Sequence, residues 1–152
     1  MITIMLESFE ERLPELLPLL PLHYEELALN KDKVPLAPQY EIYIERERRG
    51  ELMFIVVRDA GELIGYFIGF VAPGLHYKTC LTLIMDIFFI HPEHRGSATG
   101  YKLFKAAEEE AKRRGVQRMF VGSKCHLDAS FLFEQLGYER CEITYTHWLA
   151  GD

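Results

Sequence analysis

One short run of small residues has the composition of an anion-binding turn; it reads Arg95-Gly96-Ser97-Ala98-Thr99-Gly100. The segment before it, Leu81 to Ile90, is apolar except for Thr82 and Asp86, as expected of a strand that is buried on both faces. The segment after it has apolar residues at helical spacing. Backbone N–H groups of such a turn can converge at a helix N-terminus, where the helix dipole favours a bound anion.

Asp86 is the second candidate for chemistry, because a carboxylate among apolar neighbours is costly to bury unless it is paired or used. It could accept a proton as a general base. It could also face a solvent-filled gap, or pair with a basic residue of a neighbouring strand. The sequence alone leaves these alternatives open.

The bulk composition is that of one globular domain. The chain has 152 residues and is 49% hydrophobic, enough for a single core. Its net charge of -6 argues against nucleic acid as the main partner.

The cysteines are odd in number and widely spaced, and no histidine has ligand spacing with Cys, Asp or Glu, so we expect neither disulfides nor a metal. We expect no membrane span and a cytoplasmic location, because no apolar run reaches roughly 18 residues and the first residues lack a basic segment.

The elements that must position the turn and Asp86 follow from periodicity and from helix and turn signals. Prolines should divide the leucine-rich N-terminal segment into two short helices. Gly65 and Gly69 share one face of a predicted strand, where they would let a neighbour approach closely. The order predicts a mixed sheet flanked by helices. The expected elements are a strand over 2–6, helices over 10–20, 22–29 and 39–49, strands over 52–58, 63–71 and 81–90, a helix that follows the turn and closes at Gly115, a strand over 118–123, a helix over 127–136, and a last strand or strand pair over 138–149.

The turn resembles the acetyl-CoA signature of the GNAT superfamily of N-acetyltransferases, in which Arg or Gln, two spacers, Gly, one spacer and Gly or Ala precede a helix. Here Ala98 stands at the central glycine position, so the turn should be helical at that residue. The element order from Leu52 to Leu149 is also similar to the family, including the Leu-Gly-aromatic ending at Tyr138. The chain resembles small phage and bacterial members.

The resemblance implies a single α/β (α+β) domain over 1–152, with a mixed, mostly antiparallel sheet whose central parallel strand pair is splayed at the cofactor site. Variable acceptor-side helices would occupy about 8–50, and the acetyl-CoA-binding core about 80–138. Acetyl-CoA would be the cosubstrate, and a primary amine would be acetylated by direct transfer in a ternary complex. His126 would contact the cofactor arm or be a surface or capping residue. The resemblance places the cofactor on Ile87, Phe88, Phe89, Ile90, Arg95, Gly96, Ser97, Ala98, Thr99, Gly100, Tyr101, His126 and Phe133.

The same resemblance suggests how the proton moves. An aliphatic amine with a pKa near 10.4 is only about 0.04% neutral at pH 7, and Asp86 would accept its proton. Many family members have a tyrosine as general acid where this chain has Phe133, which cannot donate. Ser130, Tyr138 or water could replace it. Candidate acceptor-binding residues are Tyr24, Glu25, His76 and Tyr77.

Ala98 and Phe133 also leave a second class of function open, because both depart from the pattern of active members. The alternative is a catalytically weak binding or interaction module that holds coenzyme A structurally. A longer acyl-CoA as donor is open too. The identity of the acceptor does not follow from the sequence, and a homodimer is compatible with the resemblance.

Overall fold

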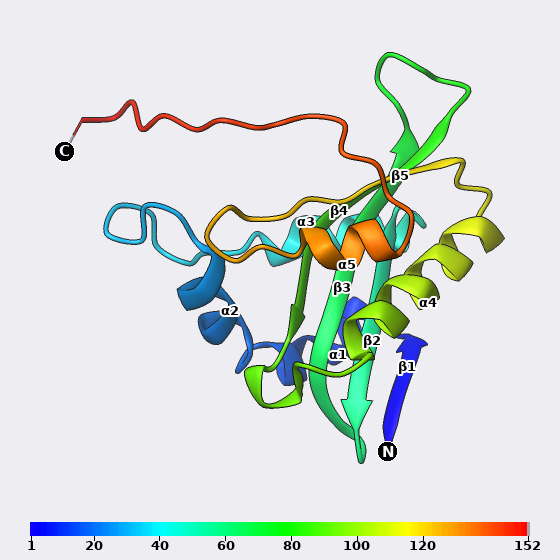
Figure 1. Cartoon of the computed structure of the whole chain (residues 1–152), viewed down its shortest axis with the longest axis horizontal. Helices are drawn as coiled ribbons and strands as arrows, with labels where there is room; N and C mark the ends of the chain where they lie inside the picture. Colours follow the sequence, from blue (N-terminus) through cyan, green and yellow to red (C-terminus); the bar gives the residue numbers. More distant parts are fainter. Residues whose placement is uncertain (152) are drawn as a thin grey trace.

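The computed structural model describes residues 1–151, which form one five-stranded sheet with helices on both faces (Figure 1). No helix in this part of the chain combines the length and the apolar character needed to cross a membrane. The elements are β1 (Ile2–Leu6), α1 (Phe9–Leu16), α2 (Leu20–Leu27), α3 (Tyr40–Arg48), β2 (Leu52–Asp59), β3 (Glu62–Pro73), β4 (Leu81–Ile90), the 3-10 turn η1 (Pro92–His94), α4 (Thr99–Arg113), β5 (Arg118–Phe120) and α5 (Ser130–Gln135).

The strands follow one another across the sheet in the order β1-β2-β3-β4-β5. The first four are antiparallel neighbours, and β5 runs parallel to β4. A helix connects this parallel pair, as the predicted mixed sheet requires. The pair lies at one edge of the sheet, and its ladder covers only Thr82–Ile84 on β4.

Two apolar cores lie on opposite faces of the sheet, because successive strand residues point to opposite faces. One core packs beneath α4 and α5 and includes Leu83, Phe104 and Phe133; we call it the α4-side core. The other packs beneath α1, α2 and α3 and includes Phe9 and Tyr66; we call it the α1-side core. Each side chain of β4 therefore points either toward α4 or toward the N-terminal helices.

Gly65 brings β3 unusually close to β4, as the sequence predicted for this position. A Cβ atom at Gly65 would lie 2.6 Å from the carbonyl oxygen of Phe89. At Gly69 it would lie 2.5 Å from a methyl group of Leu83. Glycine is required at Gly65, because the contact there is with the backbone of the neighbouring strand, whereas the contact at Gly69 is with a side chain.

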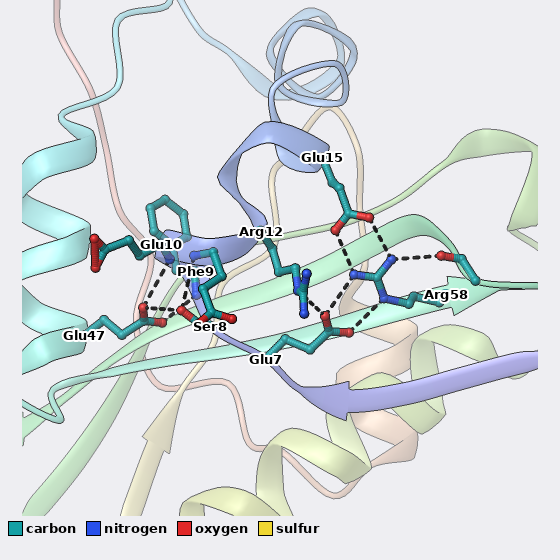
Figure 2. A network of polar contacts seen from close by, with 10 residues as sticks. Glu7, Ser8, Phe9, Glu10, Arg12, Glu15, Glu47 and Arg58 are labelled. Carbon is teal, nitrogen blue, oxygen red and sulfur yellow. Dashed lines mark hydrogen bonds and ion pairs between the residues drawn. The ribbon is translucent and has the colours of Figure 1, made fainter.

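The N-terminus of α1 is capped by two residues. Ser8 Oγ accepts a hydrogen bond from the Glu11 amide at 3.2 Å and so caps the first turn of the helix. The carboxylate that completes this cap comes from Glu47 on α3, which accepts from the Phe9 amide at 2.6 Å (Figure 2). This contact fixes α1 against α3.

Arg58 of β2 anchors the same helix to the sheet. Its guanidinium donates to Glu7, just before α1, and to Glu15 within it, each at 2.8 Å (Figure 2). These bonds hold the pKa of the Glu7 carboxyl below its usual range. Helix α1 is therefore tied to the sheet by charged contacts as well as by the α1-side core.

Two expectations for the strands are wrong. Residues 139–151 form no strand; they leave α5 as an extended arm that is mostly exposed (Figure 1, red). The alternating pattern of this segment finds no partner strand within the described chain, and a strand needs one. Nor is β4 buried on both faces: Ile84 is 55% exposed, and Asp86 is exposed as well. The strand after α4 and the last helix are both shorter than predicted.

Candidate functional site

The loop between β4 and α4 has the form of an anion cradle. Gly96 has φ +86°, a left-handed conformation that favours glycine. Ala98 has φ -76°, so the alanine fits the helical turn expected of it and caps the 15-residue helix α4. Small side chains leave the loop exposed, and several of its amides donate to no acceptor among the described residues. These are the amides of Gly96, Ser97, Ala98, Gly100 and Tyr101.

This cradle fits a phosphate-type anion. Its unpaired amides lie at the positive end of a long helix, which is the arrangement that binds phosphates in many proteins. A Cβ atom at Gly96 would meet no heavy atom within 4 Å, so the loop is open there. Ser97 Oγ and Thr99 Oγ1 are 2.8 Å apart and hold the loop in this shape.

The Arg95 side chain is engaged away from these amides. Its Nε donates to the carbonyl oxygen of Ile90 at 2.7 Å. Its two terminal nitrogens donate to the Glu26 carboxylate of α2 at 2.6 and 2.7 Å. This bidentate pair lowers the pKa of the Glu26 carboxyl.

The outer edge of β4 is open where the chain approaches the cradle. Beyond Ile84, nothing in the described chain pairs with β4 on its β5 side. The open stretch includes Ile87–Ile90, the residues expected to hold an extended cofactor arm. Its backbone groups can pair with an added strand-like ligand.

Asp86 lies at a β-bulge. In the ladder with β3, Ile87 pairs with Ile68 and Met85 pairs with Gly69, so Asp86 is the extra residue of β4. The bulge turns its carboxylate to the side of the N-terminal helices, where Tyr43 Oη of α3 donates to Oδ2 at 2.6 Å. Burial and this hydrogen bond raise the pKa of Tyr43, so its hydroxyl stays protonated and donates.

The two candidate general acids lie apart from Asp86. Tyr138 packs against the α4-side core, and its hydroxyl is 3.3 Å from Met119 Sδ. Burial raises the pKa of Tyr138. Ser130 begins α5 and donates to Asp128 at 3.0 Å. Neither is brought to the same face as the Asp86 carboxylate.

His126 and Phe133 have different surroundings. His126 Nε2 is 3.0 Å from the carbonyl oxygen of Glu26, so this loop residue contacts the end of α2. Phe133 is buried, with its ring against Phe88 and Phe104 at centroid distances of 6.2 and 5.1 Å. Phe133 therefore lies beneath the open edge of β4 as part of the core.

The four residues predicted to bind the acceptor do not come together. Tyr24 lies on α2, where its hydroxyl donates to the Val34 carbonyl, and Glu25 is exposed beside it. His76 and Tyr77 lie in the loop that precedes β4, at the far end of the strand from the cradle (Figure 1).

Sequence reasoning gave Tyr43 no role, and it did not predict the contact of His23 with Tyr66 or that of Glu26 with Arg95. His23 Nδ1 is 2.8 Å from Tyr66 Oη, and burial lowers the pKa of His23 to about 4. The one available signal was the presence of tyrosines on the predicted helix over 39–49. Among residues 1–151, no group of three or more His, Cys, Asp or Glu side chains is arranged to hold a metal ion.

Comparison with known proteins assigns the family. The sequence model of the Acetyltransferase (GNAT) family matches residues 16–138. The chain belongs to the GNAT acetyltransferase family. The match begins at the last residue of α1 and includes α2, α3 and the cradle. No curated protein matches the sequence.

Solved structures of other GNAT proteins share the fold. The ribosomal-protein-alanine N-acetyltransferase of Brucella melitensis biovar Abortus 2308 is 18% identical with a TM-score of 0.73, covering 99% of this chain and 100% of that one. The aminoglycoside acetyltransferase HMB0005 from an uncultured soil metagenomic sample is 16% identical with a TM-score of 0.76 and 99% coverage of both chains. AAC(6')-Iy, in complex with a CoA-containing bisubstrate analogue, is 14% identical with a TM-score of 0.67 and 99% coverage of both. At these identities the likeness establishes the fold.

Proposed function

We propose that this GNAT protein is a cytoplasmic, acetyl-CoA-dependent N-acetyltransferase that acetylates a primary amine by direct transfer. The observation that carries the proposal is one continuous arrangement: an open amide cradle, the open edge of β4 and the Asp86 carboxylate follow one another along a single strand and its turn. The GNAT fold and the CoA-containing ligand of AAC(6')-Iy support it. When bound, the cosubstrate supplies the acetyl group as a thioester.

The cradle and the strand edge have separate tasks in binding. The amides from Gly96 to Tyr101 would hold the pyrophosphate of coenzyme A at the positive end of α4. The backbone of Ile87–Ile90 would pair with the pantetheine arm as an added strand. One amide of this stretch would donate to the carbonyl oxygen as negative charge develops on it.

Asp86 would accept the proton that the attacking ammonium group must lose. Its Oδ2 is held by Tyr43, while Oδ1 has no partner among the described residues and is free to face an amine. Ser130, Tyr138 and water are the proposed sources of the proton for the leaving group. Tyr24, Glu25, His76 and Tyr77 are proposed for acceptor recognition.

Binding is tested by calorimetry with acetyl-CoA on the wild type and on Gly96→Val. Gly115→Val is a matched control, because Gly115 has the same φ of +86° and lies at the other end of α4, where a Cβ would also meet nothing within 4 Å. We expect Gly96→Val to lose at least about tenfold in affinity, since the side chain covers the amides. Gly115→Val should retain the wild-type affinity. Absence of acetyl-CoA binding to the wild type would overturn the proposal.

A second candidate function is a catalytically weak module that holds coenzyme A structurally. It is favoured by the burial of Phe133, because the core at this position offers no hydroxyl to the leaving group. Release of free thiol, measured with a panel of primary amines, separates the two candidates. Sustained, amine-dependent release excludes the structural role, whereas tight binding without turnover supports it.

A further inference from the structure

The last turn of α2 contacts both loops that follow the parallel strands. The Glu26 carboxylate binds Arg95, in the loop after β4, through two bonds of 2.6 and 2.7 Å. The Glu26 carbonyl oxygen is 3.0 Å from His126 Nε2, in the loop after β5. In Figure 1 the loop after β4 lies beside α2. One end of an N-terminal helix is thus joined to both sides of the region where the cofactor would enter.

The pair between Glu26 and Arg95 is more sheltered than an ordinary surface ion pair. The Glu26 side chain is 25% exposed and that of Arg95 is 35% exposed. The guanidinium also lies over the Phe89 ring, 5.6 Å from its centroid, and its Nε is held by Ile90. Bidentate geometry and partial burial both strengthen such a pair.

A phosphate in the cradle would compete with Glu26 for this guanidinium. The cradle amides begin at Gly96, the residue directly after Arg95. A bound pyrophosphate therefore brings negative charge close to the Glu26 carboxylate, and like charges at short range repel. Arg95 is the only lysine or arginine between Ile90 and Tyr101, so it is the one permanently positive side chain in the loop that both anions can share.

We propose that Glu26 limits the affinity of the cofactor site by competing with the pyrophosphate of coenzyme A for Arg95. Binding of coenzyme A transfers the guanidinium from Glu26 to the pyrophosphate, and this transfer releases the end of α2. The inference rests on the proposed function. It makes Glu26 a positioning residue that acts through Arg95, and it couples the cofactor site to the helices on the α1 side of the sheet.

The test is the affinity for coenzyme A, measured by calorimetry on the wild type, Glu26→Gln and Glu45→Gln. Glu45→Gln removes the same charge from another N-terminal helix, α3, where Glu45 is 66% exposed and pairs with Arg49 at 3.5 Å. We expect Glu26→Gln to bind coenzyme A about 3- to 10-fold more tightly, the range typical of freeing one charged partner. Glu45→Gln should stay within about twofold of the wild type.

Arg95→Gln, made in the wild type and in Glu26→Gln, provides a second measurement. Competition predicts that losing Arg95 weakens coenzyme A binding more when Glu26 is already neutral, because the guanidinium is then free for the phosphate. The inference would be overturned if Arg95→Gln lowered the affinity for coenzyme A equally in the wild type and in Glu26→Gln, or if Glu26→Gln bound coenzyme A more weakly than the wild type. Either result would mean that the ion pair between Glu26 and Arg95 supports the structure of the site. Failure of every variant and of the wild type to bind coenzyme A would instead overturn the proposed function, and this inference with it.

Discussion

The Tyr43 hydroxyl donates a 2.6 Å hydrogen bond to Oδ2 of Asp86, joining α3 to the bulge of β4. The tyrosine ring is held in place by Phe9 at 5.3 Å and Phe70 at 5.5 Å between centroids. A carboxylate on an exposed bulge can otherwise rotate freely. Here one oxygen is fixed and the other is left for a substrate, so the N-terminal helices orient the proposed base as well as covering the sheet.

Replacing Tyr43 with Phe removes this hydrogen bond and keeps the ring. We expect kcat/KM for the amine to fall about tenfold, because a hydrogen bond to a charged group is worth roughly 1.5–3 kcal/mol. The affinity for acetyl-CoA should not change, since the cradle lies elsewhere. Tyr40→Phe removes a hydroxyl from the same helix and serves as the control in thiol-release assays. Equal activity of both variants would show that Tyr43 has no role in orienting Asp86.

Asp86→Asn tests the proposed base itself. Asparagine can still accept the Tyr43 hydrogen bond through its side-chain oxygen, so the geometry of the bulge should persist. We expect the rate to fall about 10²- to 10⁴-fold, the usual contribution of a general base. The dependence of kcat/KM on pH should also change shape. Unaltered rates across the pH range would remove Asp86 from the mechanism, while calorimetry with acetyl-CoA would show whether the cofactor site is intact.

Local patterns predicted the parts of the fold that depend on neighbouring residues. The bounds of β4 were predicted correctly, because a run that is apolar except for Thr82 and Asp86 ends at a proline-containing turn. The bulge at Asp86 was not predictable, because it arises from the register of β3 against β4. The contact of Asp86 with Tyr43 joins residues 43 positions apart, and that of Glu26 with Arg95 spans 69 positions. Alternation over 138–149 indicated a strand, but alternation alone does not say which edge is free to pair with it.

Gly65→Ala tests the close approach of β3 and β4. The added methyl group would lie 2.6 Å from a backbone carbonyl oxygen, which cannot move aside as a flexible side chain can. We expect the free energy of unfolding to fall by about 1–3 kcal/mol, as for other overpacked positions. Gly122→Ala is the control, because a Cβ there would meet nothing within 4 Å. Urea unfolding of both variants measures the difference, and equal stability would mean that the strands can separate slightly at no cost.

The buried contact between His23 and Tyr66 should make stability depend on pH. His23 is 5% exposed, its Nε2 has no partner, and burial lowers its pKa from 6.5 to about 4. Below pH 6.5 the unfolded chain binds a proton at this residue and the folded chain does not, so stability is complete above pH 6.5 and declines as the pH falls toward 4. The shift in the pKa of His23 corresponds to a total loss of about 3 kcal/mol in the free energy of unfolding.

Urea unfolding between pH 7.5 and 4 measures this decline. The double variant His23→Leu/Tyr66→Phe removes both polar partners and keeps an apolar contact, so it should lose about 3 kcal/mol less than the wild type over this range. His147→Gln replaces an exposed histidine and is the control. This variant should follow the wild-type curve, because it keeps His23 and every carboxylate of the wild type. Parallel curves for the wild type and the double variant would show that His23 titrates normally in the folded protein.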